Sequence, residues 1–323
     1  MPTTETDVTP GTSDPGSALA GLRYQLPGYS GTTVGPMGYL AQERQRLSEL
    51  RWERFTVTPM SATIGGEISG INLADELDDA TIAELRQALL DYKVIFFRDQ
   101  PLSPAQHVAF ARRFGDLEVH PFISSNPDHP ELVRFEKGAD TAGYENGWHA
   151  DVTWRAEPSM GAVLHAVSVP PTGGDTLFCD MAAVYDGLPE ETKERIADLV
   201  AVHDYARAFG HNLDDEAKAE MRQRYPVVEH PVVRTHPETG RKLLYVNRFF
   251  VDSIKPMSPQ ESIGLLDELC RHTDSPEYQC RFRWRNDSVA FWDNRAVQHY
   301  AASDYFPHVR IMERASIIGD RPV

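Results

Sequence analysis

Trp148-His149-Ala150-Asp151 places an imidazole and a carboxylate two residues apart. In an extended strand, alternate side chains point to the same side, so His149 and Asp151 are predicted to lie next to each other. One strand could then supply two neighbouring ligands to a metal ion. The chain holds 12 histidines, so such pairs arise by chance and this one needs support from elsewhere.

That support lies in the C-terminal part of the chain, in Trp292-Asp293-Asn294-Arg295-Ala296-Val297-Gln298-His299. A strand over 290–292 is predicted to lead towards His299. Two imidazoles and one carboxylate on one face of a metal leave the opposite positions open for chemistry, as in non-haem iron sites. His149, Asp151 and His299 are therefore candidate metal ligands and catalytic residues.

Arg310 and Arg314 lie four residues apart in a predicted strand over 309–318, so both could enter one cavity. Glu313 alternates to the other face and is not placed to neutralise them. A guanidinium binds a carboxylate or sulfonate through two parallel hydrogen bonds, and burying it without an anion is costly. The two arginines are expected either to be exposed or to await anionic ligands.

A zinc ion could use the same three ligands. A zinc hydrolase would also need a general-base glutamate near the first pair, for which Glu145 is the nearest candidate and Glu157 is further away. The cysteines do not suggest a zinc site or a disulfide framework, because they are few, odd in number and lack CxxC spacing. We expect reduced thiols and a cytoplasmic protein; the cysteines are Cys179, Cys270 and Cys280.

The fold is predicted to be mainly β with flanking helices. Short β-branched and aromatic runs, separated by Pro and Gly turns, are typical of a sandwich or jelly roll. Helix-start signals stand at Asp78 or Asp79, at Ser103-Pro104 and at Ser258-Pro259-Gln260-Glu261. The predicted strands cover 55–58, 94–97, 162–169, 175–179, 228–234, 243–247, 288–293 and 309–318.

The chain divides into three parts by composition. Residues 1–20 are rich in Thr, Pro, Gly and Ser and are predicted to be a disordered leader. Residues 21–53 are predicted to form an arm over 21–37 and a helix within 38–53. We expect that helix to be solvated, with an oligomer or lid contact as the alternative. Residues 54–323 are predicted to form a single domain.

Charge and hydropathy exclude several kinds of partner. The formal net charge of −16 argues against nucleic acid, whose phosphates require clustered Lys and Arg. No apolar run approaches the roughly 20 residues that span a bilayer, and no signal peptide is visible. A small anionic organic substrate remains compatible with an acidic protein, because a few buried arginines can act locally.

From about Phe55 to its C-terminus, the chain resembles the taurine dioxygenase/2,4-D dioxygenase (TauD/TfdA) family of iron(II), 2-oxoglutarate-dependent oxygenases. Together the matching segments are highly specific: Ile64–Gly70, Phe96–Gln100, Phe114–Leu117, Trp148–Thr153, Thr172–Thr176, His230–Pro237 and Trp292–Asp320.

The resemblance implies a double-stranded β-helix (jelly-roll, cupin-like) core. It implies iron(II) ligation by His149, Asp151 and His299, and binding of the distal carboxylate of 2-oxoglutarate by Arg310 and Thr176. The implied reaction consumes O2 and 2-oxoglutarate, releases succinate and CO2, and hydroxylates a substrate carbon. The hydroxylated product fragments if that carbon bears a sulfonate, a sulfate ester or an ether oxygen. Family members are commonly dimeric or tetrameric, so a homodimer or homotetramer is expected.

Members that act on sulfonates or sulfate esters resemble this chain at two anion-binding positions, His120 and Arg314. Ile123 departs from their pattern because it replaces a tyrosine, and Glu145 because it replaces a small amide. Both departures lie on the substrate side of the predicted pocket, where we also place Tyr144, which precedes Glu145. Phe209, Phe249 and Phe250 are candidates for an apolar wall, with core packing as the alternative for each.

An alkyl sulfonate or alkyl sulfate is therefore the expected substrate, and taurine is less so. The alternative is a carboxylate, an amino-acid-like acid or an aryloxy acid. Two other classes are an inert jelly-roll binding protein and the zinc hydrolase. The complete set of His149, Asp151, His299 and Arg310 argues against the inert binding protein.

Overall fold

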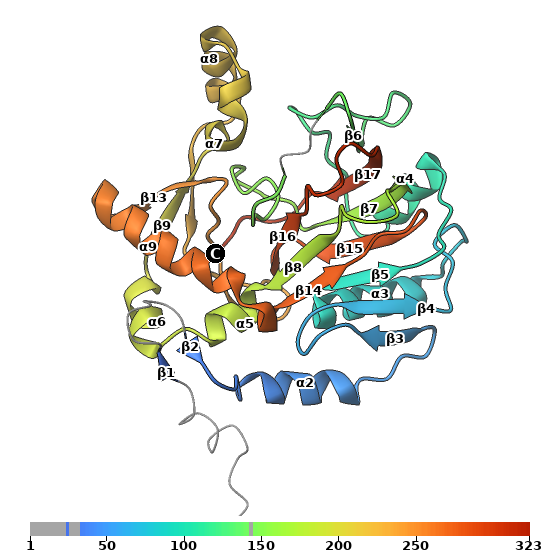
Figure 1. Cartoon of the computed structure of the whole chain (residues 1–323), viewed down its shortest axis with the longest axis horizontal. Coiled ribbons are helices and arrows are strands. Elements are labelled where there is room, and N and C mark those ends of the chain that lie inside the picture. Colours follow the sequence, from blue (N-terminus) through green and yellow to red (C-terminus); the bar gives the residue numbers. More distant parts are fainter. Residues whose placement is uncertain (1–23, 26–32, 142–144) are drawn as a thin grey trace, which may run out of the picture.

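The computed structural model describes residues 24–25, 33–141 and 145–323. Two β-sheets enclose the main hydrophobic core (Figure 1). The larger has the order β3 (Thr56–Pro59), β4 (Gly66–Ser69), β5 (Val94–Phe97), β15 (Val289–Asp293), β7 (Gly161–Ser168), β17 (Arg310–Ile317), β6 (Leu132–Lys137). The smaller has the order β14 (Gln279–Phe282), β8 (Thr176–Asp180), β16 (Val297–Ala301). This is the predicted jelly roll.

The central strands of the large sheet, β5, β15, β7 and β17, are buried on both faces, which explains their continuous apolar runs. In β5 all four residues are buried: Phe96 faces the core between the sheets, whereas Ile95 and Phe97 face a second core. That second core lies under two helices that cover the outer face, α3 (Asp79–Tyr92) and α4 (Pro104–Arg112). Alternate side chains of one strand therefore serve two different cores.

The predicted helix starts are confirmed. The Asp78 side chain accepts the backbone N–H of Thr81 at the start of α3. Ser103 begins α4 with a complete capping box, and Ser258 begins α9 (Pro259–Arg271) in the same way. Each cap satisfies backbone donors that the first helical turn leaves without a partner.

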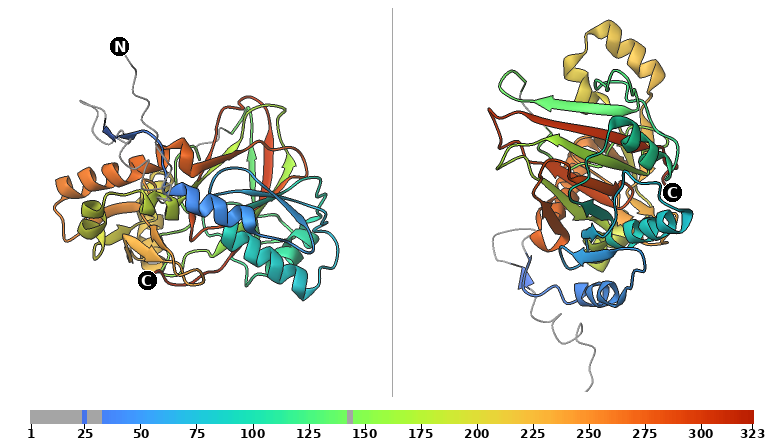
Figure 2. Two further views of the ribbon diagram at one scale, coloured as in Figure 1. Left: turned by 90° about the horizontal axis from the view of Figure 1, so that it is seen from below. Right: turned by 90° about the vertical axis from the view of Figure 1, so that its right-hand side faces the viewer.

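The remaining elements surround the two sheets (Figure 1). The helix α8 stands away from the body of the protein in Figure 1 and in the right-hand view of Figure 2, and none of its residues is buried. The elements are β1 (Tyr24–Gln25), β2 (Thr33–Val34), α5 (Met181–Asp186), α6 (Glu190–Ile196), β9 (Val200–His203), α7 (Ala206–Phe209), η1 (Gly210–Asn212), α8 (Asp215–Arg224), β10 (Val228–Pro231), β11 (Val233–Thr235), β12 (Lys242–Leu244), β13 (Val251–Lys255), η2 (His272–Asp274) and η3 (Pro276–Tyr278).

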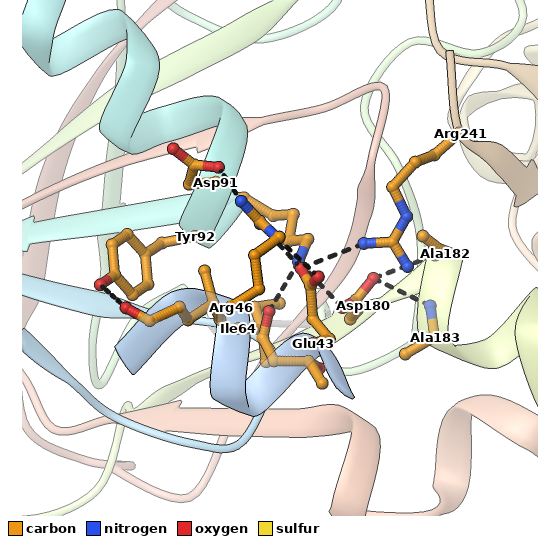
Figure 3. Close-up of polar contacts among 12 residues, drawn as sticks. Glu43, Arg46, Ile64, Asp91, Tyr92, Asp180, Ala182, Ala183 and Arg241 are labelled. Carbon is orange, nitrogen blue, oxygen red and sulfur yellow. Dashed lines mark hydrogen bonds and ion pairs between the residues drawn. The ribbon is translucent and has the colours of Figure 1, made fainter. Parts of the chain in front are cut away.

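The helix predicted within 38–53 forms as α2 (Leu40–Glu49), and most of its residues are exposed, as expected for a solvated helix, but two apolar side chains and several ion pairs attach it to the domain. Leu40 and Leu47 are buried against the two cores. Glu43 forms an ion pair with the buried Lys93 at 2.9 Å, and Arg46 binds Asp91 at 2.6 Å. Figure 3 shows Arg46 between Asp91 and Glu43, with Asp180 and Arg241 on the other side of Glu43. The ion pairs were not predicted because their partners are distant in sequence.

Several other predictions can be placed on this fold. Cys179, Cys270 and Cys280 are buried and unbridged. Within the described residues, no helix is long and apolar enough to cross a membrane. The predicted leader, 1–20, lies outside the described residues. The domain division at residue 54, the cytoplasmic location and the homo-oligomeric state stay predictions.

Candidate active site

The three predicted metal ligands come together between the two sheets. All three are buried, and one ligand atom from each lies within 4.8 Å of the other two. The Nε2 atoms of His149 and His299 each lie 3.9 Å from a carboxylate oxygen of Asp151. Two imidazoles and a single carboxylate are the donor set of non-haem iron(II) sites, so these residues could hold that metal.

Backbone and side-chain hydrogen bonds orient the two histidines. His149 and His299 form a two-residue bridge, with N–H···O distances of 3.1 and 2.8 Å. The carbonyl oxygen of Gly147 lies 2.8 Å from Nδ1 of His149, which assigns the proton to Nδ1 and leaves the lone pair on Nε2. Such bonds to the second ring nitrogen set the orientation of a metal-binding histidine.

The prediction that His149 and Asp151 share a strand is wrong. His149 forms only the isolated bridge, and Asp151 begins a turn in which Val152 has a φ of 47°. Asp151 is held instead by Asn294: the Asn294 Oδ1 accepts the Asp151 N–H at 2.8 Å, and its Nδ2 donates to the Asp151 carbonyl at 2.9 Å. The carboxylate therefore reaches the histidines without strand geometry.

The charges around Asp151 favour its ionised form. Arg314 Nη1 lies 2.8 Å from both carboxylate oxygens. Burial opposes ionisation, but Arg314 and the histidines outweigh it and lower the pKa of Asp151 to about 2. Burial, together with His149, lowers the pKa of His299 to about 3, which keeps this imidazole neutral as a metal ligand must be.

Arg310 is a buried cation that has no ion-pair partner among the described residues. Its Nε donates to the carbonyl of Gly174 at 3.2 Å, and no described residue forms an ion pair with it. Burial lowers its pKa. The close approach needs a glycine, because Gly174 has a φ of +70° and a Cβ there would lie 3.0 Å from Arg310 Cδ. The two arginines were expected either to be exposed or to be buried and to await an anion. Arg310 is buried without an anion, whereas Arg314 is buried and already paired with Asp151.

One cavity of about 920 Å³ contains these groups. Its lining in the described chain includes six Lys or Arg residues against three Asp or Glu residues, although the protein as a whole is acidic. Such a lining concentrates anions near the metal ligands. Tyr144 lies outside the described residues. The predicted site residues on the cavity wall are His120, Ile123, Glu145, His149, Asp151, Thr176, Phe209, His299, Arg310 and Arg314.

His120 offers the cavity a neutral N–H donor. Its Nδ1 accepts the backbone N–H groups of Phe122 and Ile123, each at 3.2 Å, so its proton must be on Nε2. Burial, followed by the Arg314 charge, lowers the pKa of His120 to about 3, so that this tautomer persists at neutral pH.

An aromatic wall faces the metal ligands. Phe209 stacks on Phe122 with ring centroids 4.9 Å apart, and Phe249 lies 4.9 Å from the ring of His149. The prediction of an apolar wall did not include Phe122. Glu145 lies 3.7 Å from Lys137, and the other glutamate considered as a zinc-hydrolase base, Glu157, is exposed and not among the described cavity-lining residues.

The fold and the site define an iron(II)- and 2-oxoglutarate-dependent dioxygenase. The family described as "Taurine catabolism dioxygenase TauD, TfdA family" matches residues 56–316, and the chain belongs to it. Its activity therefore uses Fe(II), 2-oxoglutarate and O2. The zinc hydrolase and the inert binding protein are set aside.

Relatives of the chain differ in the substrates that their names state. The chain is 35% identical over 275 residues to an alpha-ketoglutarate-dependent sulfate ester dioxygenase from Pseudomonas putida, covering 83% of this chain and 90% of that one. It is 36% identical over 282 residues to an (S)-phenoxypropionate/alpha-ketoglutarate-dioxygenase from Sphingobium herbicidovorans, covering 82% and 96%. A crystal structure of a taurine dioxygenase from Burkholderia xenovorans superimposes with a TM-score of 0.73 at 37% identity, covering 84% and 91%.

Proposed function

We propose that this enzyme hydroxylates a carbon of a small or medium organic anion, with a sulfate ester or an alkyl sulfonate as the favoured substrate. The observation that carries the proposal is the neutral Nε2–H of His120, which faces the same cavity as Arg314 and the metal ligands. Together a neutral donor and a guanidinium can bind a monoanionic head group beside the reacting centre.

In this proposal His149, Asp151 and His299 hold Fe(II), and Arg310 and Thr176 hold the distal carboxylate of 2-oxoglutarate. Bound iron(II) supplies O2 activation coupled to the decarboxylation of 2-oxoglutarate. The chain itself contributes orientation and exclusion of water, because the ligands are buried between two sheets and an aromatic wall covers them.

Arg314 retains donors for a substrate while it contacts Asp151. Only its Nη1 is bound to the carboxylate, and its Nε is buried without a hydrogen-bond partner in the described structure. A guanidinium has five N–H donors, so the remaining ones can face a sulfate oxygen. A substrate head group would then bind Nη2, which forms no hydrogen bond in the described structure, rather than the buried Nε.

The departure at Ile123 favours a substrate larger and less polar than taurine. Ile123 presents an apolar side chain to the cavity, and Phe209 and Phe249 extend the apolar surface. Hydroxylation of the carbon that bears a sulfate ester gives an unstable product. That product splits into an aldehyde and sulfate, in equal amounts to succinate and CO2.

The second candidate is an aryloxy carboxylate. The stacked rings of Phe122 and Phe209 offer a flat apolar surface for an aromatic ring, and one relative is named for phenoxypropionate. Hydroxylation beside the ether oxygen would release a phenol and a keto acid or an aldehyde acid.

A series of three six-carbon alkyl anions with different head groups and one aryloxy acid separates these candidates. Hexyl sulfate, hexane sulfonate, hexanoate and phenoxyacetate are compared by succinate release, with sulfate, sulfite and phenol measured in parallel. We expect hexyl sulfate to give equal amounts of succinate and sulfate. In His120→Ala, the KM for hexyl sulfate should rise about tenfold, as for a lost hydrogen bond to a charged group.

His308→Ala is the control, because His308 is exposed and not among the described residues on the cavity wall. Turnover of phenoxyacetate but not of hexyl sulfate would replace the first candidate by the second. No 2-oxoglutarate-dependent turnover of any of the four would reject both.

A further inference from the structure

The Thr176 hydroxyl has a fixed partner on the side away from the cavity. Trp284 Nε1 lies 2.9 Å from Thr176 Oγ1, and both side chains are buried. An indole N–H can only donate, so Thr176 Oγ1 is the acceptor in this bond. Trp284 is not among the described residues that line the cavity, whereas Thr176 is.

This bond determines the direction of the hydroxyl proton. A threonine hydroxyl has one proton to donate and lone pairs that accept. The indole occupies an acceptor direction, and no described residue forms another hydrogen bond to this oxygen. The proton is therefore available to an acceptor in the cavity, where Arg310 stands without an anion.

The core holds Trp284 in place. It follows β14, whose Phe282 pairs with Thr176 in the sheet. Its ring packs edge-on against Phe282, with centroids 4.9 Å apart, and Phe282 stacks on Phe96 at 4.1 Å. Because the ring cannot turn without disturbing this stack, the indole N–H is a rigid partner for Thr176.

We propose that Trp284 is a positioning residue for 2-oxoglutarate: it directs the Thr176 hydroxyl proton towards the distal carboxylate, beside the Arg310 guanidinium. The inference rests on the proposed roles of Thr176 and Arg310. Trp284 touches neither the metal ligands nor the cavity, so it should affect 2-oxoglutarate and leave the metal and the organic substrate unaffected.

A double-mutant cycle on the full chain tests this proposal. The dissociation constant of 2-oxoglutarate is measured by calorimetry in the presence of Mn(II), with the affinity for Mn(II) alone measured separately. Trp284→Phe should weaken 2-oxoglutarate binding about three- to tenfold, the scale of one hydrogen bond to a ligand-binding group. Its affinity for Mn(II) should not change, and turnover should show a raised KM for 2-oxoglutarate at nearly constant kcat.

The effect must depend on the hydroxyl. In Thr176→Val, adding Trp284→Phe should cause no further loss of 2-oxoglutarate affinity; in Thr176→Ser, which keeps a hydroxyl, it should cause the full loss. Trp52→Phe is the control, because Trp52 packs on Phe55 and is not among the described residues that line the cavity. If Trp284→Phe does not fold, β-(3-benzothienyl)alanine at position 284 keeps the ring shape and removes only the N–H.

The outcomes are distinguishable. Unchanged 2-oxoglutarate affinity in the Trp284 variants, or an equal loss in the Thr176→Val background, overturns this inference alone. If the unmodified protein with Mn(II) binds no 2-oxoglutarate, the proposed co-substrate site fails and this inference fails with it.

Discussion

Lys93 and Arg310 are both buried cations, but their surroundings differ. Lys93 Nζ lies 2.9 Å from Glu43, 3.4 Å from Asp180 and 2.7 Å from the carbonyl of Thr63. Arg310 has one bond, to the Gly174 carbonyl at 3.2 Å, and no ion pair with any described residue. Their exposed fractions are similar, 3% and 8%, so burial alone does not distinguish them.

The difference separates a structural charge from a functional one. A buried charge is tolerated when it is paired and hydrogen-bonded within the chain. The Lys93 cluster satisfies that condition and ties α2 to the end of β8. The Arg310 guanidinium does not satisfy it, which we attribute to a ligand that completes the site. Variants of the two clusters should therefore respond in opposite ways.

The largest effect on folding is expected for Lys93→Met. It leaves Glu43 and Asp180 without their shared cation, and breaking a buried pair by removing one partner costs about 3–5 kcal/mol. The free energy of unfolding from urea titration should fall by about that amount, since the buried Asp180 loses its one ion-pair partner among the described residues, whereas Glu43 keeps Arg46 and Arg241. A loss below about 1 kcal/mol, the value of an exposed pair, would show that the cluster is not structural.

Asn294→Ala tests whether metal binding depends on the hydrogen bonds that hold the ligand Asp151 in place. Loss of the two bonds to the Asp151 backbone should weaken Mn(II) binding by about 10- to 100-fold, as for other residues that orient metal ligands. Asn286→Ala is the control, because Asn286 also bonds a backbone N–H, that of Val169, but is exposed. Equal Mn(II) affinity in both variants would contradict a role for Asn294 at the metal site.

The smallest expected effect is the pH dependence of the unfolding free energy that comes from Glu43 in α2. Burial opposes ionisation of Glu43, but Arg46 and Lys93 outweigh it and lower its pKa from 4.5 to about 2. The unfolded chain therefore binds the proton first as pH falls. The stability that ionised Glu43 contributes is complete above pH 4.5 and is lost as pH falls towards 2.

Urea unfolding of the unmodified protein and of Glu43→Gln measures this contribution directly. The difference in unfolding free energy should be about 1–2 kcal/mol at neutral pH and should shrink at about pH 3.5. A difference that stays constant between the two pH values would rule out the titration of Glu43 as its source.

The amino-acid sequence was sufficient to predict the jelly roll, the helix starts and the predicted site residues that lie on the cavity wall. Apolar runs, capping motifs and family motifs are local signals that a sequence shows directly. The sequence was not sufficient for contacts that depend on chain packing. Asn294 and Trp284 act through bonds to residues 143 and 108 positions away, and nothing in their local sequence indicates those partners. The ion pair between Arg314 and Asp151 was missed for the same reason.

Arg310→Met tests the central claim most directly, that the cavity holds a buried cation reserved for a ligand. Unfolding temperatures are measured for the unmodified protein and the variant, each with Mn(II), with and without 2-oxoglutarate. We predict that 2-oxoglutarate raises the unfolding temperature of the unmodified protein only, and that without it Arg310→Met is at least as stable as the unmodified protein. A variant that is as strongly destabilised without 2-oxoglutarate as Lys93→Met would contradict the account.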